Sequence, residues 1–176
     1  LTPYVPGEQP KVSNLIKLNT NENPYSCSPK ALAAMQQAVT SDLRLYPDPN
    51  ADELRQAIAD FYNVSKENVF VGNGSDEVLA HAFAGLLKQP GKLLYPDISY
   101  SFYPVYCSLF DIESVAVPLN ETFEIELQDY QQDNGAILFP NPNAPTGIAL
   151  SLTQIRSILD NNPGSPVLVD EAYVDF

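Results

Sequence analysis

The sequence predicts an α/β fold, with a mostly parallel sheet covered by helices on both faces. Short apolar segments typical of buried strands recur from residue 69 onward, and most are followed by a segment with helical spacing. Strands that alternate with helices favour parallel pairing. The 176 residues and their 44% hydrophobic content are enough for one domain with a core of its own.

The start of the chain predicts an extended arm. Three prolines and a glycine interrupt its first residues, which show neither helical nor strand periodicity. A helix is predicted to begin after Ser28, because serine caps helix N-termini and Pro29 suits the first helical position. We therefore divide the chain into an arm over residues 1–27 and a sheet-containing domain over residues 28–176.

The remaining elements follow from periodicity and from breaks at proline and glycine. Helices are predicted at 52–62, 75–87, 102–110 and 152–159, and strands at 69–71, 93–95, 113–117, 136–139 and 166–169. The last of these strands, which we expect to be buried, delivers Asp170 at its carboxyl end. Open α/β sheets bind ligands at that edge.

The chain is strongly acidic, with nine Lys or Arg residues against 22 Asp or Glu residues and a net charge of −13. This balance argues against nucleic-acid and membrane partners, since both attract basic surfaces. No apolar run approaches the length of a membrane span. Cys27 and Cys107 form neither a disulfide framework nor a metal-binding spacing, so we expect a cytoplasmic protein without a metal site.

The turn Gly72–Glu77 joins a predicted strand to a predicted helix. Backbone N–H groups at a helix start, aided by the helix dipole, favour a phosphate group. The turn is not a dinucleotide-binding fingerprint, because Glu77 stands where the third glycine would be, and it lacks the Gly-Lys-Ser/Thr of a P-loop. A plain strand–helix connection, in which Asp76 and Glu77 complement the dipole, explains the turn equally well.

The loop Asn141–Gly147 follows a predicted buried strand. Its two prolines fix the backbone, and its asparagine amides offer donors where a ligand oxygen would lie. The alternative is a rigid surface turn, because asparagine and proline are common in turns.

Several aromatic and acidic side chains are suited to a planar heteroaromatic ligand. Tyr100 and Tyr103 follow a strand, and they either cover such a ligand or are partly buried core residues. Tyr46, beside Pro47, is either a ligand contact or a turn anchor. A carboxylate such as Asp170 beside a pyridine nitrogen favours the protonated ring, which is a better electron sink. An acidic N-cap or loop residue is the alternative for Asp170.

In this order and spacing, Gly-Asn-Gly-Ser-Asp-Glu, Tyr100, Asn-Pro-Asn-Ala-Pro-Thr-Gly and Asp-Glu-Ala-Tyr resemble the motifs of the fold type I aminotransferases, which use pyridoxal 5'-phosphate (PLP). Asn19–Pro24 and Arg44–Pro47 narrow the likeness to the histidinol-phosphate aminotransferase family. The resemblance covers essentially all 176 residues as an N-terminal portion. It implies an arm with a substrate-side loop over 1–27 and an incomplete PLP-binding large domain over 28–176, with no small domain.

The resemblance implies a role for most of these residues. Backbone amides of Ser75 and Asp76 would hold the cofactor phosphate. Tyr100 would stack on the pyridine ring, and Asp170 would pair with the ring nitrogen. Tyr173 would contact the phenolic oxygen of the ring.

The resemblance also implies contacts with the phenolic oxygen, with the partner subunit's cofactor and with the substrate. Asn143 would also contact the phenolic oxygen, although Ala144 stands where many relatives have asparagine. Tyr46 would reach the cofactor phosphate of the neighbouring subunit, which implies a homodimer. Tyr4 and Asn21 would lie near the substrate.

The activity that the resemblance implies is the exchange of an amino group between glutamate and imidazole-acetol phosphate, both small molecules. This family needs a lysine that forms a Schiff base with PLP. In relatives that lysine lies beyond the Asp-Glu-Ala-Tyr strand, hence beyond Phe176, and no lysine of this chain stands in a matching context. We therefore expect the 176-residue chain alone to be inactive.

Three alternatives stay open. Another fold type I enzyme, such as threonine-phosphate decarboxylase or an aromatic aminotransferase, would share the cofactor site. A non-catalytic fragment or binding module fits the missing lysine. A nucleotide-binding α/β domain is the third, although both phosphate-loop fingerprints are missing.

Overall fold

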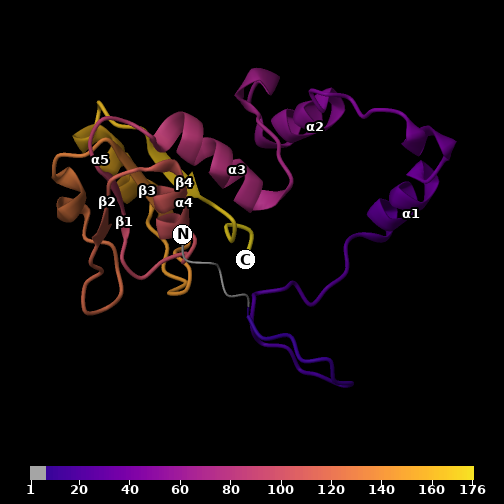
Figure 1. The fold of residues 1–176 in the computed structure, drawn as a ribbon, viewed down its shortest axis with the longest axis horizontal. Coiled ribbons are helices and arrows are strands. Elements are labelled where there is room, and N and C mark those ends of the chain that lie inside the picture. Colours follow the sequence, from indigo (N-terminus) through magenta and orange to yellow (C-terminus); the bar gives the residue numbers. More distant parts are fainter. Residues whose placement is uncertain (1–6) are drawn as a thin grey trace. The chain divides into compact units, whose positions relative to one another are not determined.

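The structure is a computed structural model that describes residues 7–176. The described chain divides into two compact units, residues 7–71 and residues 72–176 (Figure 1). The predicted limits of the arm and the sheet domain, 1–27 and 28–176, stay a prediction. None of the helices in the described residues has the length and apolar composition needed to cross a membrane.

The first unit contains two helices where the sequence predicts them, α1 (Pro29–Ala38) and α2 (Asp52–Tyr62). The Ser28 side chain accepts a hydrogen bond from the backbone N–H of Lys30 at 3.3 Å, as expected of a helix N-cap. Among residues 7–71 only Ala59 is buried. This unit therefore has almost no hydrophobic core of its own.

The predicted strand at residues 69–71 is wrong: this segment is extended but belongs to no sheet in the structure. Its backbone groups are used locally, because Val69 N–H donates to Lys66 O at 3.1 Å and Val69 O accepts from Arg55 Nε at 2.8 Å. Phe70, predicted to be buried, is 63% exposed. An apolar run forms a strand only where a neighbouring strand accepts its backbone hydrogen bonds.

The second unit holds a parallel four-stranded sheet of order β2-β1-β3-β4. The strands are β1 (Leu93–Pro96), β2 (Ser114–Val117), β3 (Ala136–Pro140) and β4 (Val167–Asp170). All four were predicted within a residue or two. The strand β4 is half-buried and not fully buried as predicted, because it lies at an edge of the sheet and pairs only with β3 among the described strands.

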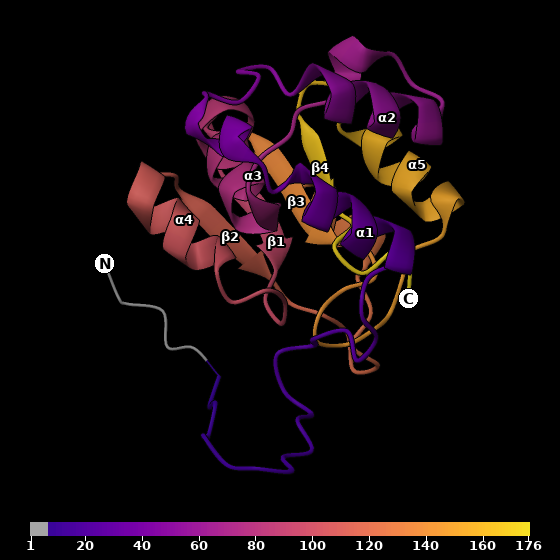
Figure 2. The same cartoon turned by 90° about the vertical axis from the view of Figure 1, so that its right-hand side faces the viewer.

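Helices cover both faces of this sheet, which confirms the predicted fold class (Figure 2). They are α3 (Gly74–Ala82), continued by a π-helical turn (Phe83–Leu87), α4 (Tyr103–Phe110) and α5 (Leu152–Asn161). Ala136 and Leu138 of β3 belong to the core cluster beneath α3 and α4, whereas Ile137 and Phe139 belong to the cluster beneath α5. This alternation is the expected period of two for a strand buried on both faces.

A close backbone contact joins the entrances of β1 and β3. Gly135 N–H donates to Lys92 O at 2.9 Å. A Cβ atom on Gly135 would lie 2.5 Å from the carbonyl oxygen of Pro90, and Gly91 has a φ of +101°. Only glycine fits both positions, so these two residues allow the segments that enter β1 and β3 to lie close together.

Candidate active site

The carboxyl ends of the strands and the start of α3 meet around a cavity of about 100 Å³. Four of the residues singled out from the sequence line it, although they come from distant parts of the chain: Ser75, Tyr100, Asp170 and Tyr173. Pro140, Ala144 and Ala172 complete the wall. The topology therefore brings these side chains to the sheet edge where α/β folds bind ligands.

The carboxylate of Asp170 is held by two donors. Its Oδ2 accepts a hydrogen bond from the Tyr103 hydroxyl at 2.8 Å, and its Oδ1 accepts one from the backbone N–H of Ala172 at 3.2 Å. The strand end is fixed as well, since Asn141 N–H donates to Asp170 O at 2.8 Å. Each carboxylate oxygen can accept a further bond, so the group stays available to a ligand.

The Tyr103 side chain is fully buried, and the sequence did not indicate its bond to Asp170. Burial, followed by the negative charge of Asp170, raises the pKa of Tyr103 well above its ordinary value. Tyr103 is therefore a neutral donor. The sequence indicated only that Tyr103, like Tyr100, follows a strand and either covers a ligand or is a core residue; the structure shows that it is a core residue.

Tyr100 connects the wall of the cavity to the start of α3. Its hydroxyl donates to Oδ1 of Asp76 at 2.8 Å, and its ring meets the Tyr103 ring edge to face at 5.5 Å. One turn further along α4, the Tyr106 hydroxyl donates to the backbone oxygen of Asp76 at 2.7 Å. Asp76 therefore accepts two hydrogen bonds, one through its side chain from Tyr100, just before α4, and one through its backbone from Tyr106 in α4.

The first turn of α3 is arranged to receive an anion. The first N–H groups of a helix have no partner within the helix, and Asn73 at the N-cap does not cap them with its side chain. The Glu77 carboxylate instead binds the N–H of Asn73, outside the helix. Gly74 has a φ of +83°, which turns the chain into α3. The amides of Ser75 and Asp76 therefore lie at an uncapped helix start, and their binding of a phosphate stays a prediction.

The Asn143 side chain is buried and does not line the cavity with Asp170. Its Nδ2 donates to Ile98 O and its Oδ1 accepts from the Ser99 hydroxyl, both at 3.0 Å. Asn143 therefore ties the loop after β3 to the loop that carries Tyr100. A contact between Asn143 and a cofactor oxygen stays a prediction.

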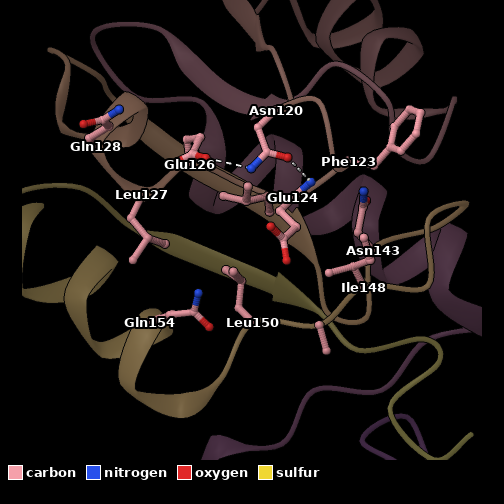
Figure 3. Close-up of a pocket in the computed structure, with 12 residues that line it drawn as sticks. Asn120, Phe123, Glu124, Glu126, Leu127, Gln128, Asn143, Ile148, Leu150 and Gln154 are labelled. Atoms are coloured by element: carbon pink, nitrogen blue, oxygen red, sulfur yellow. Dashed lines mark hydrogen bonds between the residues drawn. The ribbon is translucent and has the colours of Figure 1, made fainter.

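Asn143 lines a different and larger cavity, of about 440 Å³ (Figure 3). In this view Asn120, whose side chain donates to Glu126 at 2.7 Å, faces Ile148 and Leu150 across the cavity. Size alone does not decide which cavity binds a cofactor. The smaller one combines a helix N-terminus, an aromatic ring and a fixed carboxylate, so we take it as the candidate site.

Comparison with known proteins decides the family. Residues 13–176 match the family model for aminotransferase class I and II. The chain belongs to the class I and II aminotransferases. A histidinol-phosphate aminotransferase of Pseudomonas fluorescens is 64% identical over all 176 residues, which correspond to 50% of its length. The chain spans about half the length of the curated relatives it matches.

Solved structures of an aminotransferase and of a decarboxylase share the fold of this chain. A histidinol-phosphate aminotransferase of Sinorhizobium meliloti in complex with pyridoxal-5'-phosphate aligns with a TM-score of 0.74 and 22% identity, over 84% of this chain and 41% of its own. An L-threonine-O-3-phosphate decarboxylase of Porphyromonas gingivalis aligns with a TM-score of 0.67 and 26% identity, over 84% of this chain and 44% of its own. One fold thus serves both transamination and decarboxylation.

The substrate and phosphate contacts predicted for three other residues of this aminotransferase chain, Tyr46, Asn21 and Tyr4, stay predictions. Tyr46 and Asn21 belong to the other unit, where Tyr46 is fully exposed and Asn21 has a φ of +52°. Tyr4 lies outside the described residues. Within residues 72–176 the two lysines are engaged elsewhere: Lys88 Nζ donates to Phe110 O at 2.7 Å, and Lys92 Nζ lies 3.3 Å from Glu113 Oε1.

Proposed function

We propose that this chain is the N-terminal half of a PLP-dependent histidinol-phosphate:2-oxoglutarate aminotransferase. Such an enzyme transfers an amino group between glutamate and imidazole-acetol phosphate in histidine biosynthesis. The observation that supports the cofactor is that Ser75, Tyr100 and Asp170 line one cavity. The support for the substrate is the 64% identity to a histidinol-phosphate aminotransferase over the whole chain.

The residues around the cavity fit PLP in charge and shape. The cofactor is an anion at its phosphate, a planar ring in the middle and a base at its pyridine nitrogen. The start of α3 offers amides and a positive dipole end to the phosphate. The Tyr100 ring offers an aromatic face, and the Asp170 carboxylate an acceptor for the nitrogen. When bound, PLP supplies an electron sink for the carbanion that forms at the substrate Cα.

Each residue has a separate task in this proposal. Ser75 and Asp76 bind the phosphate through their amides, and Tyr100 orients the ring by stacking. Asp170 holds a proton at the pyridine nitrogen, which strengthens the electron sink. Tyr173, whose side chain lines the same cavity, contacts the phenolic oxygen of the ring together with Asn143.

The proposal includes a cytoplasmic homodimer in which Tyr46 reaches the cofactor phosphate of the partner subunit. The unit over residues 7–71 supports this, because it exposes large apolar side chains that a subunit interface would cover. These include Leu32, Met35, Val39, Leu43 and Phe61. Asn21 and Tyr4 are proposed to lie near the bound substrate.

Substrate assays on the full-length protein that carries this sequence test the proposal. We expect amino transfer from histidinol phosphate to 2-oxoglutarate, with weaker transfer from phenylalanine and no release of carbon dioxide from threonine phosphate. Activity with phenylalanine alone would make the protein an aromatic aminotransferase. Carbon dioxide release would make it a threonine-phosphate decarboxylase.

The 176-residue chain itself has a different expected behaviour. None of the described residues that line the cavity is a lysine, so treatment with PLP and borohydride should leave no site-specific adduct on this chain. The full-length protein should give a single adduct on a lysine beyond Phe176. A specific adduct on Lys88 or Lys92 would contradict the proposed arrangement.

A further inference from the structure

Tyr103 contacts a proposed cofactor-binding residue but has no role of its own in the proposed function. Its ring is fully buried in the core cluster beneath α3 and α4, yet its hydroxyl points out of that cluster to Asp170. A buried hydroxyl needs a partner, and at 2.8 Å the Asp170 carboxylate provides a charge-assisted one. The bond therefore joins the hydrophobic core to an acidic side chain that lines the cavity.

Packing fixes the direction of the Tyr103 hydroxyl. The ring lies 6.3 Å from the Phe83 ring, 6.1 Å from the Tyr95 ring and 5.5 Å from the Tyr100 ring, measured between centroids. Three aromatic neighbours leave the side chain little rotational freedom. A donor that is locked in this way holds its acceptor in place at little entropic cost.

The two bonds to Asp170 come from different parts of the fold. The Ala172 N–H lies two residues after Asp170, in the turn that follows β4, whereas Tyr103 belongs to α4. Among the hydrogen bonds between described residues, only the one from Tyr103 therefore ties the carboxylate to an element outside its own segment. Loss of this bond would free the carboxylate to rotate and would remove a donor that stabilises its negative charge.

We propose that Tyr103 is a positioning residue, which holds the Asp170 carboxylate oriented toward the pyridine nitrogen of the cofactor. This inference rests on the proposed function, because Asp170 acts on the cofactor and Tyr103 acts through Asp170. Tyr103 itself does not line the cavity.

The test compares Tyr103→Phe with Tyr95→Phe in the full-length protein that carries this sequence. Both changes remove one phenol hydroxyl from the same core cluster, but the hydroxyl of Tyr95 lies near the Ser114 side chain, and Tyr95 does not line the cavity. For Tyr103→Phe we expect kcat/KM to fall roughly 10- to 100-fold, mainly through kcat, as for a lost bond to a charged group. The visible absorbance of bound PLP should also titrate at a changed pH. Tyr95→Phe should lower only the melting temperature.

A double-mutant cycle separates positioning from general stability. In an Asp170→Asn background, Tyr103→Phe should cause less than about a threefold further loss of kcat/KM, because the residue through which it acts is already altered. Equal losses in both backgrounds would show that Tyr103 does not act through Asp170, and would overturn the inference.

Other outcomes are equally decisive. Wild-type activity and a wild-type PLP spectrum in Tyr103→Phe would overturn the role of Tyr103 while leaving the proposed function intact. A full-length wild-type protein that neither binds PLP nor transfers amino groups would overturn both. Should the phenylalanine variant fail to fold, a fluorinated tyrosine at position 103 keeps the ring and is a stronger donor. An unchanged PLP spectrum in that protein would contradict the inference.

Discussion

The hydroxyl of Tyr100 lies 2.8 Å from Oδ1 of Asp76 and donates a hydrogen bond to it. This bond joins the aromatic wall of the cavity to the helix start that is proposed to hold the cofactor phosphate. The ring proposed to stack on PLP and the turn proposed to bind its phosphate are therefore held as one unit. Substitutions can separate the stacking role of the ring from the linking role of the hydroxyl.

Tyr100→Phe keeps the aromatic face but loses the bond to Asp76. We expect the dissociation constant for PLP in the full-length protein to rise about threefold to tenfold, as for one hydrogen bond. Tyr100→Leu removes the face as well and should raise it further. Fluorescence titration of the apoenzyme with PLP measures both. Equal constants for the two variants would show that stacking contributes nothing.

The amide of Ser75 is a separate target, because proline is tolerated in the first turn of a helix but has no N–H. Ser75→Pro should weaken PLP binding by about tenfold or more, through loss of one charge-assisted hydrogen bond to the phosphate. Ser75→Ala keeps the amide and is the matched control. Similar losses in the two variants would assign the phosphate contact to the Ser75 hydroxyl and not to its amide.

Tyr130 belongs to the core cluster beneath α5, and its hydroxyl offers a test of how burial affects stability. Its hydroxyl is buried and has no hydrogen-bond partner among the described residues. Tyr130→Phe should therefore leave the free energy of unfolding at pH 7 unchanged or raise it by about 1 kcal/mol. Tyr95→Phe, which removes a hydroxyl that lies near the Ser114 side chain, should lower that free energy by up to about 1 kcal/mol.

The difference between wild type and Tyr130→Phe should grow at alkaline pH. Burial, followed by the charges of Asp97 and Asp129, raises the pKa of Tyr130 in the folded state. In the unfolded chain this tyrosine ionises above about pH 10, which lowers the free energy of unfolding of the wild type. The phenylalanine variant has no hydroxyl at this position and should not show this decrease. Urea unfolding between pH 7 and pH 11 measures this. A constant difference across the range would contradict the prediction.

Gly135 is predicted to be intolerant of any side chain. Gly135→Ala would place a Cβ atom 2.5 Å from the carbonyl oxygen of Pro90, and should lower the free energy of unfolding by about 1–3 kcal/mol. Gly164→Ala is the control, because a Cβ atom there meets no atom within 4 Å. It should change stability by less than about 0.5 kcal/mol. Equal melting temperatures for the two variants would refute the close contact between the entrances of β1 and β3.

Local sequence signals were sufficient for most of the fold. Ser28 with Pro29 and the apolar run of residues 136–139 each produce the element that their chemistry favours. Residues 69–71 did not, because their apolar run looks like a strand but the backbone of Val69 bonds to Lys66 and Arg55. Whether a run becomes a strand depends on a partner that the run itself does not encode.

The site was predictable only in part, for a similar reason. The sequence indicated Asp170 and Tyr100, because an acidic or aromatic residue after a strand lies at the ligand-binding edge. It did not indicate that Tyr103 bonds to Asp170, or that the Asn143 amide is engaged by Ile98 and Ser99. These partners are distant in sequence, and only the packed fold determines which hydroxyl meets which acceptor.

A crystal structure of the full-length protein with PLP is the most direct test of the central claim. We expect a pyridine nitrogen within about 3 Å of an Asp170 carboxylate oxygen. We also expect the Tyr100 ring against the pyridine face and the phosphate at the amides of Ser75 and Asp76. A cofactor bound elsewhere, for example in the larger cavity beside Glu124 and Glu126, would contradict the account.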